Sequence, residues 1–177
     1  MSSRNMIFAG FGGQGVLFTG KVVAQAGLNE GKEVSWMPSY GPEMRGGTAN
    51  CSVCVSDDPI GSPLVTEPDI LIAMNGPSYD KFIGMVAPGG LAIIDSTLVN
   101  RQCERDDIRL VAVPATQLSK DEELDGIANM ILLGKMLAES NFTSLENLEK
   151  SVQKCVPAGK THLLVHNMRA IKLGMEY

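Results

Sequence analysis

The sequence lacks the features that mark several classes of protein. Its net charge is -5, its acidic residues are scattered, and no basic cluster is present to attract nucleic acid or an anionic membrane surface. No apolar run approaches the roughly 20 residues that a membrane-spanning helix needs. The first residues, Met1–Asn5, do not contain the apolar core of a signal peptide. We therefore expect a cytoplasmic protein that binds neither nucleic acid nor a membrane.

Cysteines are few, and their spacing disfavours the common metal motifs. Cys51, Cys54, Cys103 and Cys155 do not form the closely spaced run that holds an iron–sulfur cluster. Cys51 and Cys54 have a C-x-x-C spacing, but their neighbours predict a strand, on which positions three apart point to opposite faces. Two buried reduced thiols are therefore favoured over a zinc or redox pair. Any iron–sulfur clusters that act with this chain are expected on another chain.

A complete catalytic set is also missing. No Ser/His/Asp or Cys/His combination is spaced for nucleophilic catalysis, so we predict no catalytic residue on this chain alone. His162 and His166 lie four positions apart on a predicted helix and share one face, as in a two-histidine metal site. No third ligand is evident, so an ordinary polar helix face is favoured and no metal site is predicted.

The distribution of apolar residues predicts an α/β fold. The 177 residues are 44% hydrophobic, enough for a single domain, 1–177, whose core needs neither metal nor disulfides. Strand and helix patterns alternate over the first two thirds of the chain, and helices dominate the last third. This order predicts three layers, with a mostly parallel sheet covered by helices. The strand over 48–56 is a candidate for antiparallel pairing.

Six strands and five helices are expected. The predicted strands cover 5–9, 33–37, 48–56, 70–74, 91–94 and 110–114. The predicted helices cover 16–30, 76–86, 127–138, 145–156 and 163–177. The fourth helix follows Thr143-x-x-Glu146, which predicts a capping box. Gly20 and Gly27 on the first helix predict close packing against a neighbouring element.

Four segments follow the carboxyl ends of the predicted strands, where ligands bind in open α/β sheets. They are Gly10–Gly15, Tyr40–Gly47, Asn75–Gly76 and Asp95–Ser96. The first, GFGGQG, joins a strand to a helix, so its backbone N–H groups and the helix N-terminus could face an anionic group. Glycine serves equally for tight packing between a strand, a helix and a partner subunit. Both interpretations of the turn stay open.

The same turn matches only half of a dinucleotide-binding fingerprint. Gly10-x-Gly12-x-x-Gly15 has the glycine spacing, but the fingerprint also needs an acidic residue at the end of the second strand to bind the ribose. Glu33 stands at the start of that strand, and its end reads Trp36–Pro38. NAD binding is therefore disfavoured.

The segment Tyr40–Gly47 offers one cation in a glycine-rich context. Arg45, followed by Gly46, could present a bidentate guanidinium to a phosphate or carboxylate. A salt bridge to Glu43 or to a partner chain is the equal alternative. Tyr40 is either a packing aromatic or a hydrogen-bonding contact.

Four segments together resemble the gamma subunit of 2-oxoacid:ferredoxin (acceptor) oxidoreductases. They are GFGGQGV at 10–16, PSYGPEMRGG at 38–47, DDPIGSP at 57–63 and PDIL at 68–71, and the resemblance spans nearly the whole chain. It implies a complex that oxidatively decarboxylates a 2-oxoacid with coenzyme A to an acyl-CoA and CO2, and that passes two electrons to ferredoxin. The segments 38–45 and 72–75 look more like 2-oxoglutarate or branched-chain enzymes than pyruvate enzymes, and 2-oxoglutarate is favoured. Indolepyruvate oxidoreductases carry a related domain.

The resemblance also implies cofactors and partners. Thiamine diphosphate and magnesium would lie between alpha and beta subunits, and iron–sulfur clusters on beta or a ferredoxin-like delta subunit. This chain would hold no cofactor alone, would be inactive in isolation, and would support the coenzyme A side of the complex. The implied cofactor-binding candidates are Gly12, Gly13, Gln14, Gly15, Tyr40, Arg45, Gly46 and Asn75, with Arg45 a candidate for a coenzyme A phosphate. The alternatives are a free-standing NAD(P)-dependent reductase and a non-catalytic regulator that binds coenzyme A or a nucleotide.

Overall fold

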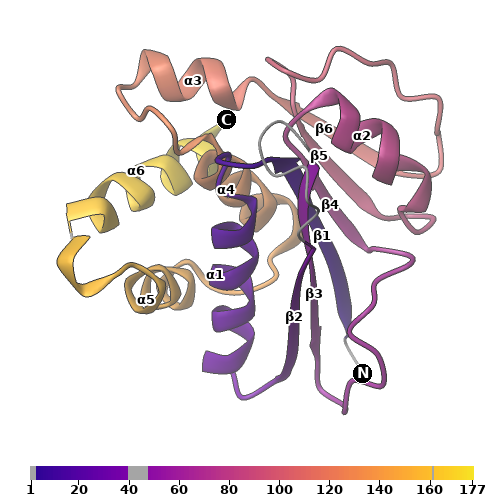
Figure 1. Cartoon of the computed structure of the whole chain (residues 1–177), viewed down its shortest axis with the longest axis horizontal. Coiled ribbons are helices and arrows are strands. Elements are labelled where there is room, and N and C mark those ends of the chain that lie inside the picture. The colour runs from indigo at the N-terminus through magenta and orange to yellow at the C-terminus, as the bar shows by residue number, and fades with distance from the viewer. Residues whose placement is uncertain (1–2, 40–47, 161) are drawn as a thin grey trace.

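The computed structural model describes residues 3–39, 48–160 and 162–177, which contain one six-stranded sheet (Figure 1). The strand order is β2-β3-β1-β4-β5-β6. β1, β4, β5 and β6 pair in parallel, whereas β3 runs antiparallel to both of its neighbours. The predicted sheet, mostly parallel with one antiparallel strand at 48–56, is confirmed. The strands are β1 (Arg4–Phe11), β2 (Glu33–Ser39), β3 (Thr48–Ser56), β4 (Ile70–Ala73), β5 (Leu91–Asp95) and β6 (Arg109–Val113).

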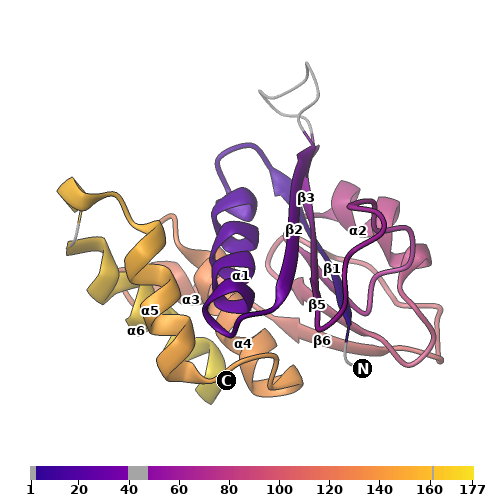
Figure 2. The ribbon, with the colours of Figure 1, turned by 90° about the horizontal axis from the view of Figure 1, so that it is seen from below.

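Helices cover both faces of the sheet, as the three-layer prediction requires. α2 lies on one face, while α1 and α4 lie on the other, with α5 and α6 packed outside them (Figure 2). The helices are α1 (Val16–Asn29), α2 (Gly76–Phe82), α3 (Ala115–Asp121), α4 (Ala128–Ser140), α5 (Leu145–Cys155) and α6 (His162–Glu176), with short 3-10 turns at Ile83–Met85 and Ala158–Lys160. Among the described residues, no helix has the length and apolar character to cross a membrane.

Two local predictions need correction. The polar segment Ala115–Asp121 forms the helix α3, which the sequence did not predict. The Asp95 carboxylate holds its first turn by accepting a hydrogen bond from the Thr116 N–H at 3.1 Å. The cap of α5 is Ser144, whose hydroxyl accepts from the Asn147 N–H at 3.1 Å, so the predicted capping box is wrong by one residue.

A tertiary contact explains the shifted cap. Thr143 donates its hydroxyl hydrogen to the Glu30 carboxylate at the end of α1 instead of capping α5. The Asn147 side chain donates to the same carboxylate at 3.1 Å and to the Ala26 carbonyl oxygen at 2.9 Å. These bonds dock α5 on α1 and fix the register of the cap.

The cysteines on β3 behave as the strand pattern predicts. Cys51 lies in the apolar cluster beneath α1, and Cys54 lies in the cluster on the opposite face of the sheet. Both thiols are free and buried. Burial raises the pKa of the Cys51 thiol to about 12, so this thiol stays protonated at neutral pH. This environment suits a packing side chain and does not favour a metal ligand.

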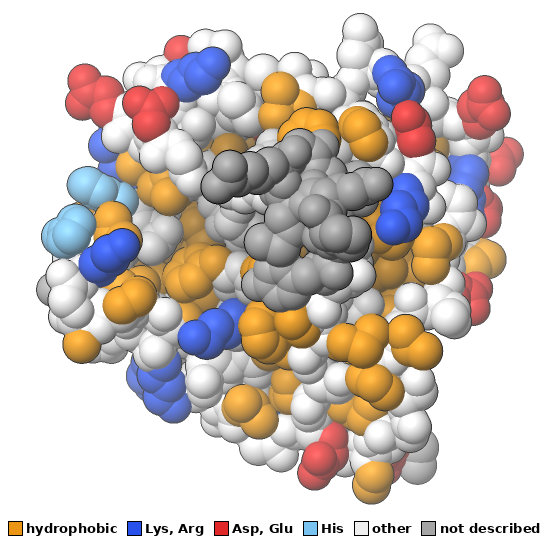
Figure 3. All heavy atoms as spheres, viewed as in Figure 1, with side chains coloured by type: hydrophobic (Ala, Val, Ile, Leu, Met, Phe, Trp, Pro, Cys, Tyr) orange, Lys and Arg blue, Asp and Glu red, His pale blue; other side chains and the backbone are white. Residues whose placement is uncertain are grey.

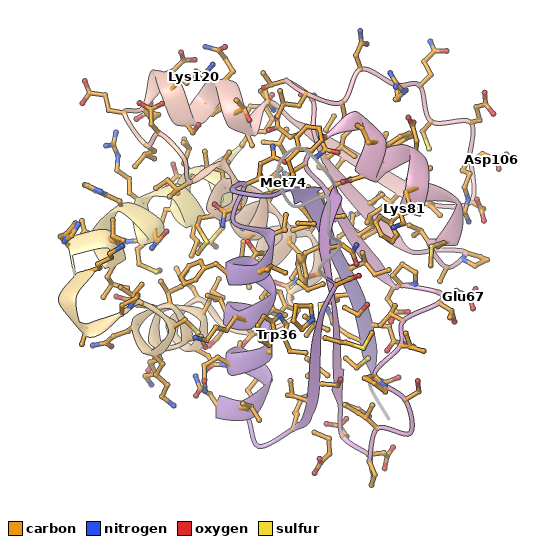
Figure 4. The ribbon with its side chains drawn as sticks, viewed as in Figure 1. Trp36, Glu67, Met74, Lys81, Asp106 and Lys120 are labelled. Atoms are coloured by element: carbon orange, nitrogen blue, oxygen red, sulfur yellow. The ribbon has the colours of Figure 1, made fainter. Side chains whose placement is uncertain are left out.

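Glycines let α1 lie close to the sheet. A Cβ at Gly20 would collide with the Cys51 sulfur and lie 3.1 Å from the indole nitrogen of Trp36, which stands on β2 beside the helix (Figure 4). A Cβ at Gly27 would lie 2.8 Å from Val34 and 2.9 Å from Val55. The predicted close packing at both positions is confirmed.

α4 and α6 cross with their backbones in contact. A Cβ at Gly134 would overlap the carbonyl group of Ile171, and a Cβ at Gly174 would overlap that of Ile131. The two glycines face each other's helix, so each removes a side chain from the crossing point. This contact ties the C-terminal helix to the core.

Substituting Gly134→Ala tests that crossing. We expect the free energy of unfolding to fall by about 1–3 kcal/mol, because the added methyl group overpacks a backbone contact. Gly84→Ala is the matched control, since a Cβ there meets nothing within 4 Å, and it should change stability by less than about 0.5 kcal/mol. Urea unfolding measures both, and equal stability of the two variants would contradict the inferred contact.

Candidate functional site

The strand ends bring three of the four predicted loop segments to one edge of the sheet. β1, β4 and β5 end there, next to Gly12–Gly15, Asn75 and Asp95 respectively. The carboxylate of Asp95 is fully buried. It accepts hydrogen bonds from the Thr97 N–H and from the N–H and hydroxyl of Thr116, so it joins the end of β5 to the start of α3. The sequence therefore predicted correctly that these three segments meet at one edge of the sheet, where Gly12 and Gly13 are exposed.

The glycine turn leaves the N-terminus of α1 without a side-chain cap. Gly15 is the N-cap residue in a left-handed conformation (φ 77), and no side chain among the described residues caps the helix. The first turn also contains no acidic residue. The first N–H groups of a helix have no partner within it, and the helix dipole adds positive potential there. This end of α1 can therefore attract an anionic group.

The side chains of Gln14 and Asn75 hold this turn in place. The Gln14 side-chain oxygen accepts from the Phe11 N–H at 2.6 Å and from the Asn75 side-chain amide at 3.1 Å. The Gln14 amide donates to the Met74 carbonyl oxygen at 3.4 Å, and Met74 lies beside the start of α1 (Figure 4). Asn75 also accepts from the Ser78 N–H at 2.9 Å, which caps α2. These two predicted site residues contact each other, so their amides join β1 to β4.

Asn129 supports the turn from its other side. Its side-chain nitrogen donates to the Gly15 carbonyl oxygen at 3.2 Å and to the Thr19 hydroxyl at 3.1 Å. Its side-chain oxygen is buried without a hydrogen-bond partner among the described residues. An unsatisfied buried polar atom costs about 1–3 kcal/mol. Sequence reasoning missed Asn129, although it is one of few polar residues in the first two turns of an otherwise apolar helix.

A cleft of about 600 Å³ lies beside the same turn. Four segments form its walls, and together they contribute Gly13 and Gly15, the Glu123–Ile127 connection, Val156–Pro157 and residues of α6. No sequence pattern predicted this cleft, because its walls come from segments more than one hundred residues apart. Its position gives the glycine turn two different sides, one bonded to β4 and one facing the cleft.

Three of the predicted site residues, Tyr40, Arg45 and Gly46, lie outside the described residues. His162 and His166 are exposed on α6, where they lie at the surface (Figure 3). Within 3–39, 48–160 and 162–177, no group of three or more His, Cys, Asp or Glu side chains is placed to hold a metal ion.

The sheet order separates this site from a dinucleotide fold. β3 lies between β1 and β2, so the second strand is not the neighbour of the strand that precedes the glycine turn. Glu33 pairs with Ser56 at the opposite end of β3 from Thr48, which pairs with Phe11 beside the turn. The only acidic residue on β2 therefore stands at the wrong end to bind a ribose next to the turn.

Comparison with known proteins identifies similar chains. The family model "Pyruvate ferredoxin/flavodoxin oxidoreductase" matches residues 5–177. Ketoisovalerate oxidoreductase subunit VorA of Methanothermobacter thermautotrophicus is 41% identical over 172 residues, which cover 96% of this chain and 35% of VorA. The 2-oxoglutarate synthase subunit KorC of Methanocaldococcus jannaschii is 34% identical over 176 residues, covering 98% of this chain and 92% of KorC. The chain thus spans about a third of VorA and nearly all of KorC.

Solved structures share the fold over its full length. The gamma subunit of a keto/oxoacid ferredoxin oxidoreductase from Geobacter sulfurreducens superposes with a TM-score of 0.86 at 30% identity, covering 99% of this chain and 96% of that subunit. A chain of the 2-oxoglutarate:ferredoxin oxidoreductase from Magnetococcus marinus superposes with a TM-score of 0.87 at 22% identity, covering 99% of this chain and 31% of that one. The second match shows the fold alone.

Substituting Gly15→Ala tests how tightly the turn is held. Both Gly15 and Gly31 have positive φ angles, 77° and 72°, so either alanine costs about 1–2 kcal/mol of backbone strain. A Cβ at Gly15 would also lie 2.5 Å from the Asn129 amide nitrogen, whereas a Cβ at Gly31 meets nothing within 4 Å. We expect Gly15→Ala to lower the free energy of unfolding by at least about 1 kcal/mol more than Gly31→Ala in urea unfolding. An equal loss would show that Asn129 does not pack on the turn.

Proposed function

This chain belongs to the pyruvate ferredoxin/flavodoxin oxidoreductase family, and we propose that it is the gamma subunit of a complex that oxidises a 2-oxoacid. In the proposed reaction, a 2-oxoacid and coenzyme A yield an acyl-CoA and CO2, and two electrons pass to ferredoxin. The observation that carries the proposal is the full-length correspondence to a separate gamma subunit, of which 96% is covered. The KorC of Methanocaldococcus jannaschii is also covered over 92% of its length.

The proposed partners are alpha, beta and delta subunits, with ferredoxin as the electron acceptor and the cytoplasm as the location. Thiamine diphosphate, magnesium and iron–sulfur clusters are assigned to those subunits. The thiols of this chain do not fit a cluster, because Cys51 and Cys54 lie on opposite faces of the sheet and burial raises the pKa of both. Burial also raises the pKa of the Cys155 thiol. The isolated chain should therefore be inactive.

The 2-oxoacid is proposed from the names of the relatives. KorC proteins are named as 2-oxoglutarate synthase subunits and VorA proteins as ketoisovalerate oxidoreductase subunits. Gamma subunits named as common to pyruvate and ketoisovalerate oxidoreductases of Thermococcus litoralis match at 25% identity. We place 2-oxoglutarate first, because 92% of the KorC chain is matched but only 35% of VorA, and branched-chain 2-oxoacids second.

The glycine turn is proposed as the coenzyme A side of the subunit. Coenzyme A supplies the thiol that accepts the acyl group, and its phosphates are the anions that this turn could bind. The uncapped N-terminus of α1 and the glycines at 13 and 15 fit a phosphate, because N–H groups can approach it without a side chain in between. Gln14 and Asn75 would act by positioning the turn, since their amides bond each other and Gln14 also bonds the Met74 carbonyl oxygen just after β4.

Two other functions have less support. A free-standing NAD(P)-dependent reductase would need an acidic ribose ligand, and Glu33 stands at the far end of β2. A non-catalytic regulator that binds coenzyme A or a nucleotide would need no partner subunits. Purification of the native assembly separates all three functions.

Affinity purification of the tagged chain from anaerobically grown source cells tests the complex. We expect thiamine-binding and iron–sulfur subunits to be recovered with it, and dye reduction that requires both coenzyme A and 2-oxoglutarate. Rates with 2-oxoglutarate, 3-methyl-2-oxobutanoate and pyruvate rank the substrates. Recovery of a lone protein that binds NAD(P) or coenzyme A would replace the subunit assignment with one of the two alternatives.

Substituting Arg45→Ala in the assembled complex tests the proposed phosphate contact. Loss of a charge-assisted hydrogen bond, about 1.5–3 kcal/mol, should raise the KM for coenzyme A by roughly ten- to a hundredfold while the KM for the 2-oxoacid stays unchanged. Arg109→Ala is the control, because Arg109 begins β6 at the opposite edge of the sheet and pairs with Glu139. Unchanged dependence on coenzyme A in Arg45→Ala would remove Arg45 from the site.

A further inference from the structure

The cleft beside the glycine turn has the dimensions of a small-molecule site. Its volume of about 600 Å³ falls within the range of roughly 300–1,000 Å³ that is usual for ligand pockets. Its walls come from the glycine turn, the connection between α3 and α4, the turn after α5, and the first half of α6. Of these walls, only the glycine turn belongs to the proposed coenzyme A side.

Apolar side chains form most of the cleft surface. Such a lining favours a ligand with a flat or narrow apolar body, because water is displaced from both surfaces when they meet. The apolar residues that line it are Phe18, Leu124, Ile127, Val156, Pro157 and Leu163.

Asn129 provides a hydrogen-bond acceptor in this apolar setting. It lines the cleft and is only 4% exposed. Its side-chain nitrogen donates to the Gly15 carbonyl oxygen and to the Thr19 hydroxyl. Its side-chain oxygen has no partner among the described residues. Because the donors are already used, the amide can offer a ligand only the oxygen. A ligand that bonds it must therefore carry an N–H or O–H donor.

The charged side chains of the cleft do not favour a second anion. Glu123 and Asp125 line it on one side, and Lys160 and His166 line it on the other. The two carboxylates offset the lysine, so the cleft lacks the positive excess that a phosphate needs. The anion-attracting end of α1 and this cleft thus differ in chemistry, although Gly13 and Gly15 border both.

We propose that this cleft binds a small-molecule group with an uncharged N–H donor on an apolar body, such as an aminated ring or a carboxamide, and that Asn129 Oδ1 is the acceptor. The oxygen is covered in this structure, so binding includes a shift of the cleft wall that uncovers it and leaves the bonds from Asn129 to Gly15 and Thr19 in place. This site stands on the cleft and Asn129, and it does not depend on the proposed role in a 2-oxoacid oxidoreductase.

Titration of the 15N-labelled full chain with matched pairs of probes tests the site. The probes are adenosine and nicotinamide, and the controls are N6,N6-dimethyladenosine and N,N-dimethylnicotinamide, which lack the N–H donor. We expect at least one probe to shift the side-chain amide resonance of Asn129 in a saturable way, and its dimethyl control to bind at least about tenfold more weakly. The probe that binds identifies whether the donor belongs to an aminated ring or a carboxamide.

Two tryptophan variants locate the binding. Leu163→Trp fills the cleft and should weaken binding of the active probe at least about tenfold, whereas Leu164→Trp is the control because Leu164 lines a different groove on α6. Three results would overturn the proposal: neither probe binds, the dimethyl analogue binds equally well, or Leu163→Trp binds as the unmodified chain does. The comparison of probes with their analogues needs no variant, so it decides the question even if Leu163→Trp fails to fold.

Discussion

The close approach of α1 to the sheet determines where the other elements of this site can lie. Gly20 and Gly27 leave no side chain between the helix and strands β2 and β3, where any Cβ would strike Cys51, Val34 or Val55. With α1 held this near, its N-terminus begins directly above the end of β1, and α5 docks along its outer side through Asn147. The uncapped helix end therefore lies at the edge of the sheet where β4 and β5 also end.

The glycine turn has two sides with different chemical roles. On the side of β4, the amides of Gln14 and Asn75 bond each other and the strand, so the turn is fixed without any charged group. On the side of α4, Asn129 bonds the carbonyl oxygen of Gly15 and keeps an oxygen unpartnered. Side-chain amides thus hold the turn from both sides, and no side chain among the described residues caps the start of α1.

The position of β3 distinguishes this fold from a dinucleotide-binding fold that has the same glycine spacing. An antiparallel strand between β1 and β2 moves the second parallel strand one position away from the glycine turn. The usual ribose ligand then has no place beside the turn, and Glu33 stands at the other end of β2. This chain has that strand order, and it belongs to the pyruvate ferredoxin/flavodoxin oxidoreductase family. Glycine spacing alone is therefore a poor guide to the ligand.

The sequence by itself determined the order of the six strands, the sheet with one antiparallel strand, the opposite faces of Cys51 and Cys54, and the family resemblance. These properties depend on local periodicity and on contiguous motifs, which a single chain displays directly. Only the tertiary structure decided that Ser144 caps α5, that Thr116 begins α3 on Asp95, and that Asn129 meets Gly15. The last two depend directly on a hydrogen bond between segments distant in the chain, and the first depends on one indirectly, because Thr143 bonds Glu30 instead of capping α5. No periodic pattern records such a bond, because it forms only when packing brings the two segments together.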